Sequence, residues 1–487
     1  MPNFTPVQKA QLDERGIAED EAARQLALLA SPPVYVELVR ACVVGDGVDR
    51  IEPDAQEALV LLHEQAAREG RCAKFVPASG AASRMFQGLR TGSDTRGFLD
   101  AIERFPFVDD LRAELAFRGY DLDVLKVAGS AREIVDALLD PDGLDYEAMP
   151  KGLIPFHRYG EAARTAIEEH LAEAAATIAR DDRTCRVHVT VSPEHRHAFR
   201  LLAERAVSVH EDRLGVRFDL AWSVQRASTD TIAGDPAGGP FTTAEGTLVL
   251  RPSGHGALLA NLQEVDADVL LVKNIDNVQR DGRRQATVRW KKILGGSLIA
   301  LQREVHLHVA RLRAADLGPR AHAEAAEFAR LRFGIEAEGP ALLPALDRPL
   351  RVCGVVPNTG EPGGGPFWVR GTDGAVSRQI VERAQLDPSR ADQRALFASS
   401  THFNPVDLAC GMNDAAGVKF ALRRFVDPKT SILTRKAHAG RELLALERPG
   451  LWNGAMAGWL TAFVEIPIET FTPVKAVMDL LRPEHQP

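Results

Sequence analysis

Cys72-Ala73-Lys74-Phe75-Val76-Pro77-Ala78-Ser79-Gly80-Ala81-Ala82-Ser83-Arg84-Met85-Phe86 is the stretch that decides the fold class of this 487-residue chain. It begins with a short apolar strand over residues 73–76, continues as a loop of small residues, and turns helical at Ser83. A strand, a tight loop and a helix in this order are typical of α/β folds, in which ligands bind beyond the carboxyl ends of the strands. The stretch therefore predicts an α/β core with a candidate site at this loop.

The same alternation of strand and helix returns along the chain. Four further stretches are interpreted as strands, at residues 187–191, 216–225, 247–250 and 268–274. The last is an almost continuous apolar run, which is typical of a strand buried inside a parallel sheet. Residues 285–314 predict one long helix, and we interpret its Lys291-Lys292 pair as a solvated face. Together these elements predict an α/β core over about residues 71–315.

Helical patterns precede this core, and a second region follows it. Residues 19–30 and 55–68 have apolar residues at helical spacing, with Asp54 as the expected cap of the second helix. Residues 339–349 are interpreted as a connector before a strand at 350–356. We therefore expect a helical N-terminal extension over 1–70, the α/β core over 71–345, and a smaller α+β region over 346–487.

Composition excludes several classes of protein. Hydrophobic residues make up 45% and charged residues 26%, as in ordinary globular proteins. A formal net charge of -8 gives no general attraction for nucleic acid or anionic membranes. The five cysteines have no CxxC spacing, the first residues lack a signal-peptide pattern, and no apolar run is long enough to span a bilayer. We expect a cytoplasmic protein that binds neither nucleic acid nor membranes.

The loop after the first strand could hold phosphate. Backbone N–H groups at Ala78, Ser79, Gly80 and Ala81 lie where a strand gives way to a helix, and Arg84 adds a positive charge that suits phosphate oxygens. Small-residue loops also serve close packing, so both readings stay open on this loop alone.

Two further stretches end predicted strands with residues suited to ligand binding. Arg251-Pro252-Ser253-Gly254-His255-Gly256 frees the backbone around a histidine. Asp276 follows the buried strand in Asn274-Ile275-Asp276-Asn277, where one carboxylate together with substrate phosphates can hold Mg²⁺. The alternative for Asp276 and Asn277 is a helix cap or a turn.

In this order, the segments resemble the UDP-sugar pyrophosphorylases, especially UDP-glucose and UDP-N-acetylhexosamine pyrophosphorylases. The segments that carry the resemblance are the loop 78–85, Lys151-Gly152-Leu153-Ile154-Pro155-Phe156, Ser223-Val224-Gln225-Arg226, the histidine and aspartate segments above, and Thr470-Phe471-Thr472-Pro473-Val474-Lys475 with Asp479-Leu480-Leu481. The last is the most specific. The resemblance covers about residues 73–481 in patches and suggests a bacterial branch related to these enzymes.

The resemblance implies a nucleotidyltransferase of the GT-A type with a Rossmann-like core. In its reaction UTP and a sugar 1-phosphate give a UDP-sugar and pyrophosphate, with Mg²⁺ as cofactor. Carried over, Gln225 and the Gly254 backbone would contact uracil, His255 and Asn274 would lie near the sugar phosphate, and Asp276 would hold the metal. Arg84, Lys151 and Lys475 would neutralise phosphate charge, and Asn404 is a sugar-phosphate candidate by position only. The partners implied are a nucleoside triphosphate and a sugar phosphate, with the oligomeric state open.

Two other functions remain possible from the sequence. The same core could transfer a nucleotide from another triphosphate, such as CTP, to a non-sugar acceptor. The chain could also be a non-catalytic sensor of nucleotide sugars, because its loop keeps one glycine, Gly80, where the family's loop is rich in glycine.

Overall fold

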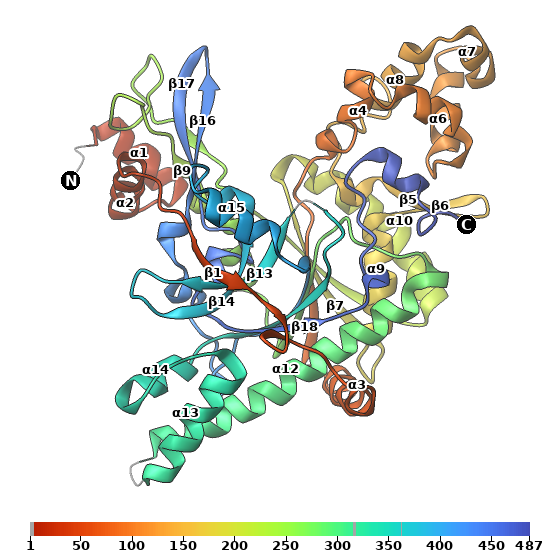
Figure 1. Ribbon diagram of the computed structural model, residues 1–487. Coiled ribbons are helices and arrows are strands. Elements are labelled where there is room, and N and C mark those ends of the chain that lie inside the picture. The colour runs from red at the N-terminus through yellow and green to blue at the C-terminus, as the bar shows by residue number, and fades with distance from the viewer. Residues whose placement is uncertain (1–3, 315–317, 362) are drawn as a thin grey trace. The chain divides into compact units, whose positions relative to one another are not determined.

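The computed structural model describes residues 4–314, 318–361 and 363–487, and the chain forms two compact units (Figure 1). The first unit collects residues 1–59, 225–270 and 294–465, and the second collects 60–224, 271–293 and 466–487. Each unit thus gathers stretches that lie far apart in the sequence. The predicted division of the chain at residues 70 and 345 concerns continuous segments, and it stays a prediction.

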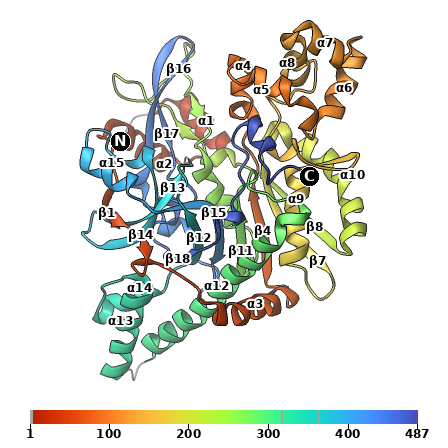
Figure 2. The same cartoon turned by 45° about the vertical axis from the view of Figure 1, so that its right-hand side comes forward.

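The second unit contains the α/β part that the sequence predicts. Its strands follow the order β11-β4-β7-β8, with bounds Val269–Lys273, Cys72–Pro77, Thr184–Val191 and Arg217–Val224. Strands β4, β7 and β8 are parallel neighbours. Figure 2 shows helices α9 (Ala166–Thr177) and α10 (Arg196–Leu214) packed beside β7 and β8. All five residues of β11 are buried, as its continuous apolar sequence predicts.

The prediction that a helix begins at Ser83 is wrong. After β4 the chain forms only the 3₁₀ turn η1 (Ala82–Arg84) and the five-residue helix α4 (Gln87–Thr91). The Ala82 N–H donates to Met149 O at 2.8 Å, so a contact with a distant segment holds the loop before a longer helix can start. The small helices α6 (Val108–Phe117), α7 (Leu122–Ala128) and α8 (Ala131–Leu139) follow later in the same unit and lie together (Figure 1).

The first unit is built on a mixed sheet. Strand β12 (Leu350–Pro357) pairs antiparallel with β15 (His402–Gly411) and parallel with β18 (Leu460–Glu465), which pairs with β3 (Gly47–Asp49). Strand β13 (Gly364–Arg370) pairs with β1 (Glu37–Ala41) and β14 (Val376–Glu382). The expected strand at 350–356 is confirmed. The expected connector at 339–349 is wrong in part, because it holds the short helix α14 (Leu342–Leu346).

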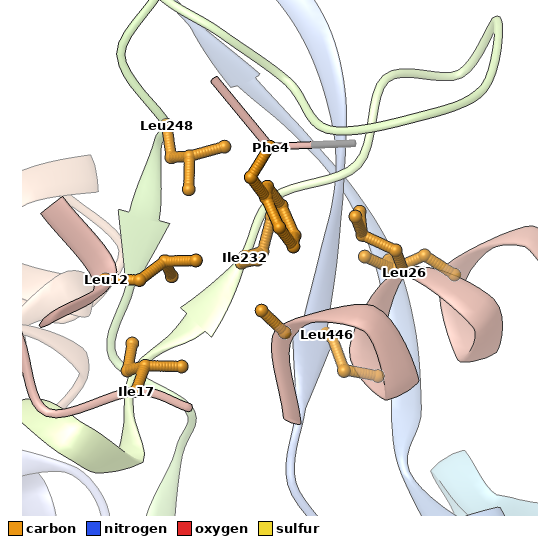
Figure 3. Packing of buried hydrophobic residues seen from close by; sticks show 9 residues of the cluster. Phe4, Leu12, Ile17, Leu26, Ile232, Leu248 and Leu446 are labelled. Atoms are coloured by element: carbon orange, nitrogen blue, oxygen red, sulfur yellow. The ribbon is translucent and has the colours of Figure 1, made fainter. Parts of the chain in front are cut away.

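The N-terminal helices belong to this first unit. Helices α1 (Pro6–Arg15) and α2 (Glu19–Ala30) pack their apolar faces on strands β9 (Thr231–Ile232), β10 (Leu250–Arg251) and β17 (Arg441–Glu447), as Figure 3 shows. The cluster contains Phe4, Leu12, Ile17, Leu26, Ile232, Leu248 and Leu446 among its buried members. The strand expected at 247–250 is confirmed at Leu250 alone, because β10 begins there and residues 247–249 form no strand. Burial of these side chains, each worth about 1.5–3 kcal/mol, docks the helices onto these strands, which belong to two small two-stranded sheets, β9-β10 and β16-β17 (Ile432–His438 is β16).

Two long helices are confirmed close to their expected bounds, but the roles expected for Asp54 and Lys291 are wrong. Helix α3 covers Pro53–Arg68, so Asp54 lies in its first turn and is not its cap. Helix α12 covers Arg284–Arg313, as expected. Lys291 on this helix is 1% exposed, so the solvated face expected there is wrong for Lys291, whereas Lys292 forms an ion pair with Glu64 at 2.5 Å. In the described part of the chain, no helix combines the length and apolarity needed to cross a membrane.

A buried ion cluster links β4 and β11 in the second unit. The Glu173 carboxylate accepts from Lys74 Nζ at 2.8 Å and from Lys273 Nζ at 2.6 Å, and all three residues are 2% exposed or less. Burial lowers the pKa of Lys74, and Lys273 lowers it further, while Glu173 opposes the shift. The lysines outweigh burial at Glu173 and hold the pKa of its carboxyl well below its usual value.

Candidate functional site

Asp276 is the centre of the site in the second unit. It follows β11, where the carboxyl end of a buried strand delivers side chains to the edge of the sheet. Lys151 Nζ lies 3.0 Å from Asp276 Oδ2, and Lys475 Nζ lies 3.3 Å from the same oxygen. The two lysines and the aspartate, predicted from three separate segments, therefore meet at one carboxylate.

The Asp276 carboxylate is ionised, and one of its two oxygens, Oδ1, has no partner among the described residues. Burial alone would raise the pKa of Asp276, but the ammonium groups of Lys475 and Lys151 outweigh it and hold the pKa below its usual 3.8. Oδ1 of Asp276 is buried, and no residue in the described part of the chain hydrogen-bonds to it. The Nδ2 of the neighbouring Asn277 is buried and unpartnered in the same sense. Buried polar atoms without partners are costly, so both atoms suit a bound ligand or ion.

The loop 78–85 lies next to Lys151. The Lys151 N–H donates to Gly80 O at 3.4 Å, and Ala81 forms a bridge with Pro150. The Ala78 N–H is used by Thr190 O at 2.9 Å, so Ala78 offers no amide to a ligand. The N–H groups of Ser79, Gly80 and Ala81 donate to no residue that the structure describes.

The loop is not strained, although Gly80 is its single glycine. None of its residues has a positive φ, and a Cβ added at Gly80 would meet nothing within 4 Å. Alanine and serine can therefore adopt the conformation that the loop has here. The observation that favoured a non-catalytic sensor, a single remaining glycine, loses its conformational basis.

The C-terminal segment brings Lys475 to the site. The Val474 N–H donates to Asp276 O at 3.0 Å, and Val474 O accepts from Lys151 Nζ at 2.9 Å. Asp479 Oδ2 accepts from the N–H groups of Lys475 at 2.7 Å and Ala476 at 2.8 Å. The Lys-x-x-x-Asp spacing of the sequence is thus the spacing of a side-chain cap.

Arg84 and Asn274 lie in the same unit. Arg84 is exposed and forms no ion pair or hydrogen bond within the described part of the chain. Asn274 is half-buried, and its carbonyl oxygen lies 3.1 Å from His170 Nε2. Arg84 is therefore a free cation on the loop, while the backbone of Asn274 is fixed by a buried histidine.

Gln225, Gly254, His255 and Asn404 belong to the first unit. Nε2 of Gln225 is buried without a partner among the described residues. Gly254 has φ +74°, a conformation that favours glycine. His255 stacks on Trp452 with ring centroids 4.3 Å apart, and its Nδ1 accepts from the Leu451 N–H at 3.1 Å.

Burial lowers the pKa of His255 to about 4, so the imidazole is neutral at pH 7. Because Nδ1 accepts a hydrogen bond, the proton of the neutral ring resides on Nε2. His255 can donate a hydrogen bond to a ligand but brings no charge.

Both polar atoms of Asn404 are used by the backbone. Its Nδ2 donates to Gly354 O at 2.9 Å, and its Oδ1 accepts from the Val406 N–H at 3.1 Å. Val406 has φ +55°, an unusual conformation for a β-branched residue, and it lies beside the irregular register of β12 and β15. These contacts give Asn404 a structural role, and its assignment to the sugar phosphate stays a prediction.

The residues at Asp276 fit a magnesium ion bound mainly by its substrate. Across 4–314, 318–361 and 363–487, no three His, Cys, Asp or Glu residues are grouped closely enough to form a metal cage. One free carboxylate oxygen, Oδ1, is available at Asp276. Mg²⁺ is commonly held by one or two carboxylates together with substrate phosphates.

The sequence analysis did not identify the buried ion cluster of Lys74, Glu173 and Lys273, two of whose residues lie in the strands that lead to the site. Lys74 and Lys273 stand inside the apolar runs of β4 and β11, and Lys273 directly precedes Asn274. A lysine within a strand that is otherwise apolar is the signal that could have indicated a buried partner.

Solved structures with a similar fold are UDP-sugar pyrophosphorylases. A uridine diphosphate N-acetylglucosamine pyrophosphorylase from Trypanosoma brucei, in complex with an inhibitor, matches with a TM-score of 0.51 at 12% identity, over 98% of this chain and 79% of that chain. A UDP-glucose pyrophosphorylase variant from Leishmania major, in complex with UDP-glucose, has a TM-score of 0.47 at 12% identity, over 98% and 79%. The first match shows that the mixed α/β fold of this chain is that of the pyrophosphorylases.

The chain belongs to the family described as domain of unknown function DUF4301, whose model matches residues 5–486. No curated protein matches the chain. The bacterial branch suggested by the sequence stays a prediction.

Proposed function

We propose that this protein is a nucleotidyltransferase of the UDP-sugar pyrophosphorylase type, with a GT-A-type core, which converts UTP and a sugar 1-phosphate to a UDP-sugar and pyrophosphate. The observation that carries the proposal is the convergence of Lys151 and Lys475 on Oδ2 of Asp276, whose Oδ1 stays free. The pyrophosphorylase fold supports it.

The reaction needs positioning and positive charge more than covalent help from the protein. An oxygen of the sugar 1-phosphate attacks the α-phosphorus of UTP. The new P–O bond forms as the bond to the oxygen bridging to the β-phosphate breaks, and pyrophosphate leaves with that electron pair. Lys151 and Lys475 stabilise the negative charge on the phosphates, and Arg84 and the free N–H groups of Ser79, Gly80 and Ala81 bind the triphosphate.

Mg²⁺, when bound at Oδ1 of Asp276, supplies further positive charge to the phosphates. Asp276 also holds the two ammonium groups at one place, because both pair with its Oδ2. In the first unit, Gln225 and the Gly254 backbone are the groups proposed to contact the base, and the neutral His255 is proposed to donate a hydrogen bond to the sugar phosphate. In the second unit, Asn274 is the group proposed for the sugar phosphate.

The first test is a thermal-shift screen with UTP, CTP, ATP and GTP, each with and without Mg²⁺. A ligand that binds the native state at 100 times its Kd adds about 2.7 kcal/mol to the free energy of unfolding. We expect a Mg²⁺-dependent shift with UTP, and its loss in Asp276→Asn. Asp123→Asn, at an exposed carboxylate of the same unit, is the matched control and should keep the shift.

Pyrophosphate release with glucose 1-phosphate and N-acetylglucosamine 1-phosphate then separates the candidate functions. Release with UTP supports the proposal. A shift and release with CTP alone would indicate a different nucleotidyltransferase, and binding without release would indicate a sensor. No shift with any nucleotide at millimolar concentration would refute nucleotide binding at this loop.

A further inference from the structure

The C-terminal segment Thr470–Lys475 runs antiparallel beside residues 276–279. Asn277 and Pro473 form a bridge, and the Thr472 N–H donates to Asn277 Oδ1 at 3.0 Å. Proline has no N–H, so a regular backbone ladder cannot pass through Pro473. Side chains of the 276–279 stretch supply the missing bonds.

Gln279 and Thr472 make the most of these bonds. Gln279 Nε2 donates to Thr470 O at 2.9 Å and to Thr472 Oγ1 at 3.0 Å. The hydroxyl of Thr472 in turn donates to Val278 O at 2.9 Å. Gln279 is 2% exposed and Thr472 is 6% exposed, so water cannot replace these bonds cheaply.

The same glutamine is tied to the buried ion cluster. Its Oε1 accepts from Lys273 Nζ at 3.4 Å, and Lys273 Nζ donates to Glu173 Oε2 at 2.6 Å. A rigid, fully buried group thus fixes the amide of Gln279, and the amide fixes the C-terminal segment.

The ion pair of Lys475 is too weak to place this segment by itself. The side chain of Lys475 is 37% exposed, and its Nζ lies 3.3 Å from Asp276 Oδ2. Partly exposed pairs of this kind contribute little, because two long side chains lose freedom and water screens the charges. Besides the bonds at Val474 and at the Lys475 N–H described above, the buried bonds that order the segment lie at Thr470 and Thr472.

We propose that Gln279 and Thr472 are positioning residues that hold the segment Thr470–Lys475 in place and so set the ammonium of Lys475 on Asp276. The catalytic consequence of this inference rests on the proposed function, whereas the placement of Lys475 does not.

The test compares Gln279→Met and Thr472→Val with Thr472→Ser. Met and Val keep the approximate size of the side chains but remove the hydrogen bonds, and Ser keeps the hydroxyl. Acetylation of the folded proteins with acetic anhydride, followed by peptide mass spectrometry, gives the rate at Lys475 relative to Lys126, a half-buried lysine of the same unit that pairs with Glu103 at 3.5 Å.

We expect Gln279→Met and Thr472→Val to raise the relative rate at Lys475 about two- to fivefold, the factor that loss of a partly exposed ion pair implies. Amide exchange of the 470–475 peptide should also quicken, and Thr472→Ser should match the wild type in both. Asp276→Asn, which removes the partner carboxylate, is the positive control for a released Lys475.

Turnover gives the second readout. If the proposed function holds, kcat falls about tenfold or more in the two variants while KM for UTP changes little, and Thr472→Ser restores kcat. If the wild type transfers no nucleotide, the proposed function fails, and the acetylation ratio still decides the inference. Unchanged acetylation and exchange in variants with wild-type melting temperatures would overturn it, and so would a Thr472→Ser protein that behaves like Thr472→Val.

Discussion

Glu173→Gln should destabilise the second unit severely at neutral pH. Glu173 is the carboxylate that Lys74 and Lys273 share at 2.8 and 2.6 Å, in a cluster with at most 2% exposure. The substitution keeps the shape of the side chain and removes its charge. Two ammonium groups are then left in the core without a counter-charge.

The magnitude follows from two limits. Breaking one buried ion pair by removing a partner costs about 3–5 kcal/mol. A buried lysine can instead give up its proton, which costs about 4.6 kcal/mol at pH 7 for a group with an unperturbed pKa of about 10.4. With two lysines affected, we expect a loss of about 5–9 kcal/mol, which is comparable to the whole stability of an ordinary domain.

Urea unfolding followed by circular dichroism at pH 7 and pH 9 is the assay. In the variant, a lysine that is neutral when folded takes up a proton on unfolding until the pH exceeds its unfolded pKa. Stability therefore rises with pH in this window, by up to about 1.4 kcal/mol per pH unit and lysine. Burial already lowers the pKa of Lys74 to about 7 in the wild type, which gives the wild type part of this slope, so the deficit narrows by less than the slope of the variant.

Two control proteins make the result decisive. Glu64→Gln removes a partly exposed partner of Lys292 and should cost less than about 1 kcal/mol. If Glu173→Gln does not fold at pH 7, the triple variant Lys74→Met, Glu173→Leu, Lys273→Met should restore folding, because apolar groups of similar size replace a buried ion cluster at little cost. A Glu173→Gln protein within about 1 kcal/mol of the wild type at pH 7 would refute the reasoning.

Three further predictions concern the site, a buried histidine and two glycines. Lys475→Met should lower kcat about a thousandfold, because a charge about 4 Å from a phosphate at an effective dielectric of about 20 contributes about 4 kcal/mol. The same substitution should change the free energy of unfolding by less than about 1 kcal/mol. Lys151→Met, at a side chain that is only 13% exposed, should lower kcat and also cost about 3 kcal/mol of stability. Pyrophosphate release and urea unfolding measure both, with Lys126→Met as the matched control, and equal stability losses at the two site lysines would contradict the prediction. Burial lowers the pKa of His63 to about 4, so its unfolded form alone binds a proton between pH 6.5 and 4 and stability falls by about 1.4 kcal/mol per pH unit on acidification; His63→Leu should remove that part of the slope in urea titrations. Gly80→Ala should change stability by less than about 0.5 kcal/mol, whereas Gly254→Ala, at φ +74°, should cost about 1 kcal/mol or more in the same titrations.

The regular elements could be predicted where a run of one kind of side chain decides the local structure. Strand β11 and helix α12 follow directly from an apolar run and a helical repeat, and both are confirmed. The turn η1 could not be predicted, because its cause is the bond from Ala82 to Met149, far away in the sequence. The prediction that Lys291 faces solvent is wrong for a related reason. A sequence pattern places lysine in solvent unless a buried partner is known.

The site could be predicted as a set of residue types and not as a geometry. The sequence names Lys151, Asp276 and Lys475, but Lys151 and Lys475 lie 125 and 199 residues from Asp276 along the chain, so only folding can bring each lysine within 3.3 Å of the Asp276 carboxylate. For Asn404 the sequence offers only a position, and the structure shows that a bulge already uses both atoms of its amide.

The assembly of the second unit from separated stretches also sets an order in time during synthesis. Asp276 is translated 199 residues before Lys475, and at about 5–20 residues per second the ribosome needs roughly 10–40 s to cover that distance. During that interval the nascent chain contains Asp276 and Lys151 but not Lys475. It also lacks the segment Thr470–Lys475, to which Gln279 donates hydrogen bonds in the folded protein. If the proposed function holds, a nascent chain should therefore be unable to transfer a nucleotide until residues 470–475 have been added and have left the exit tunnel, however early its sheets have folded.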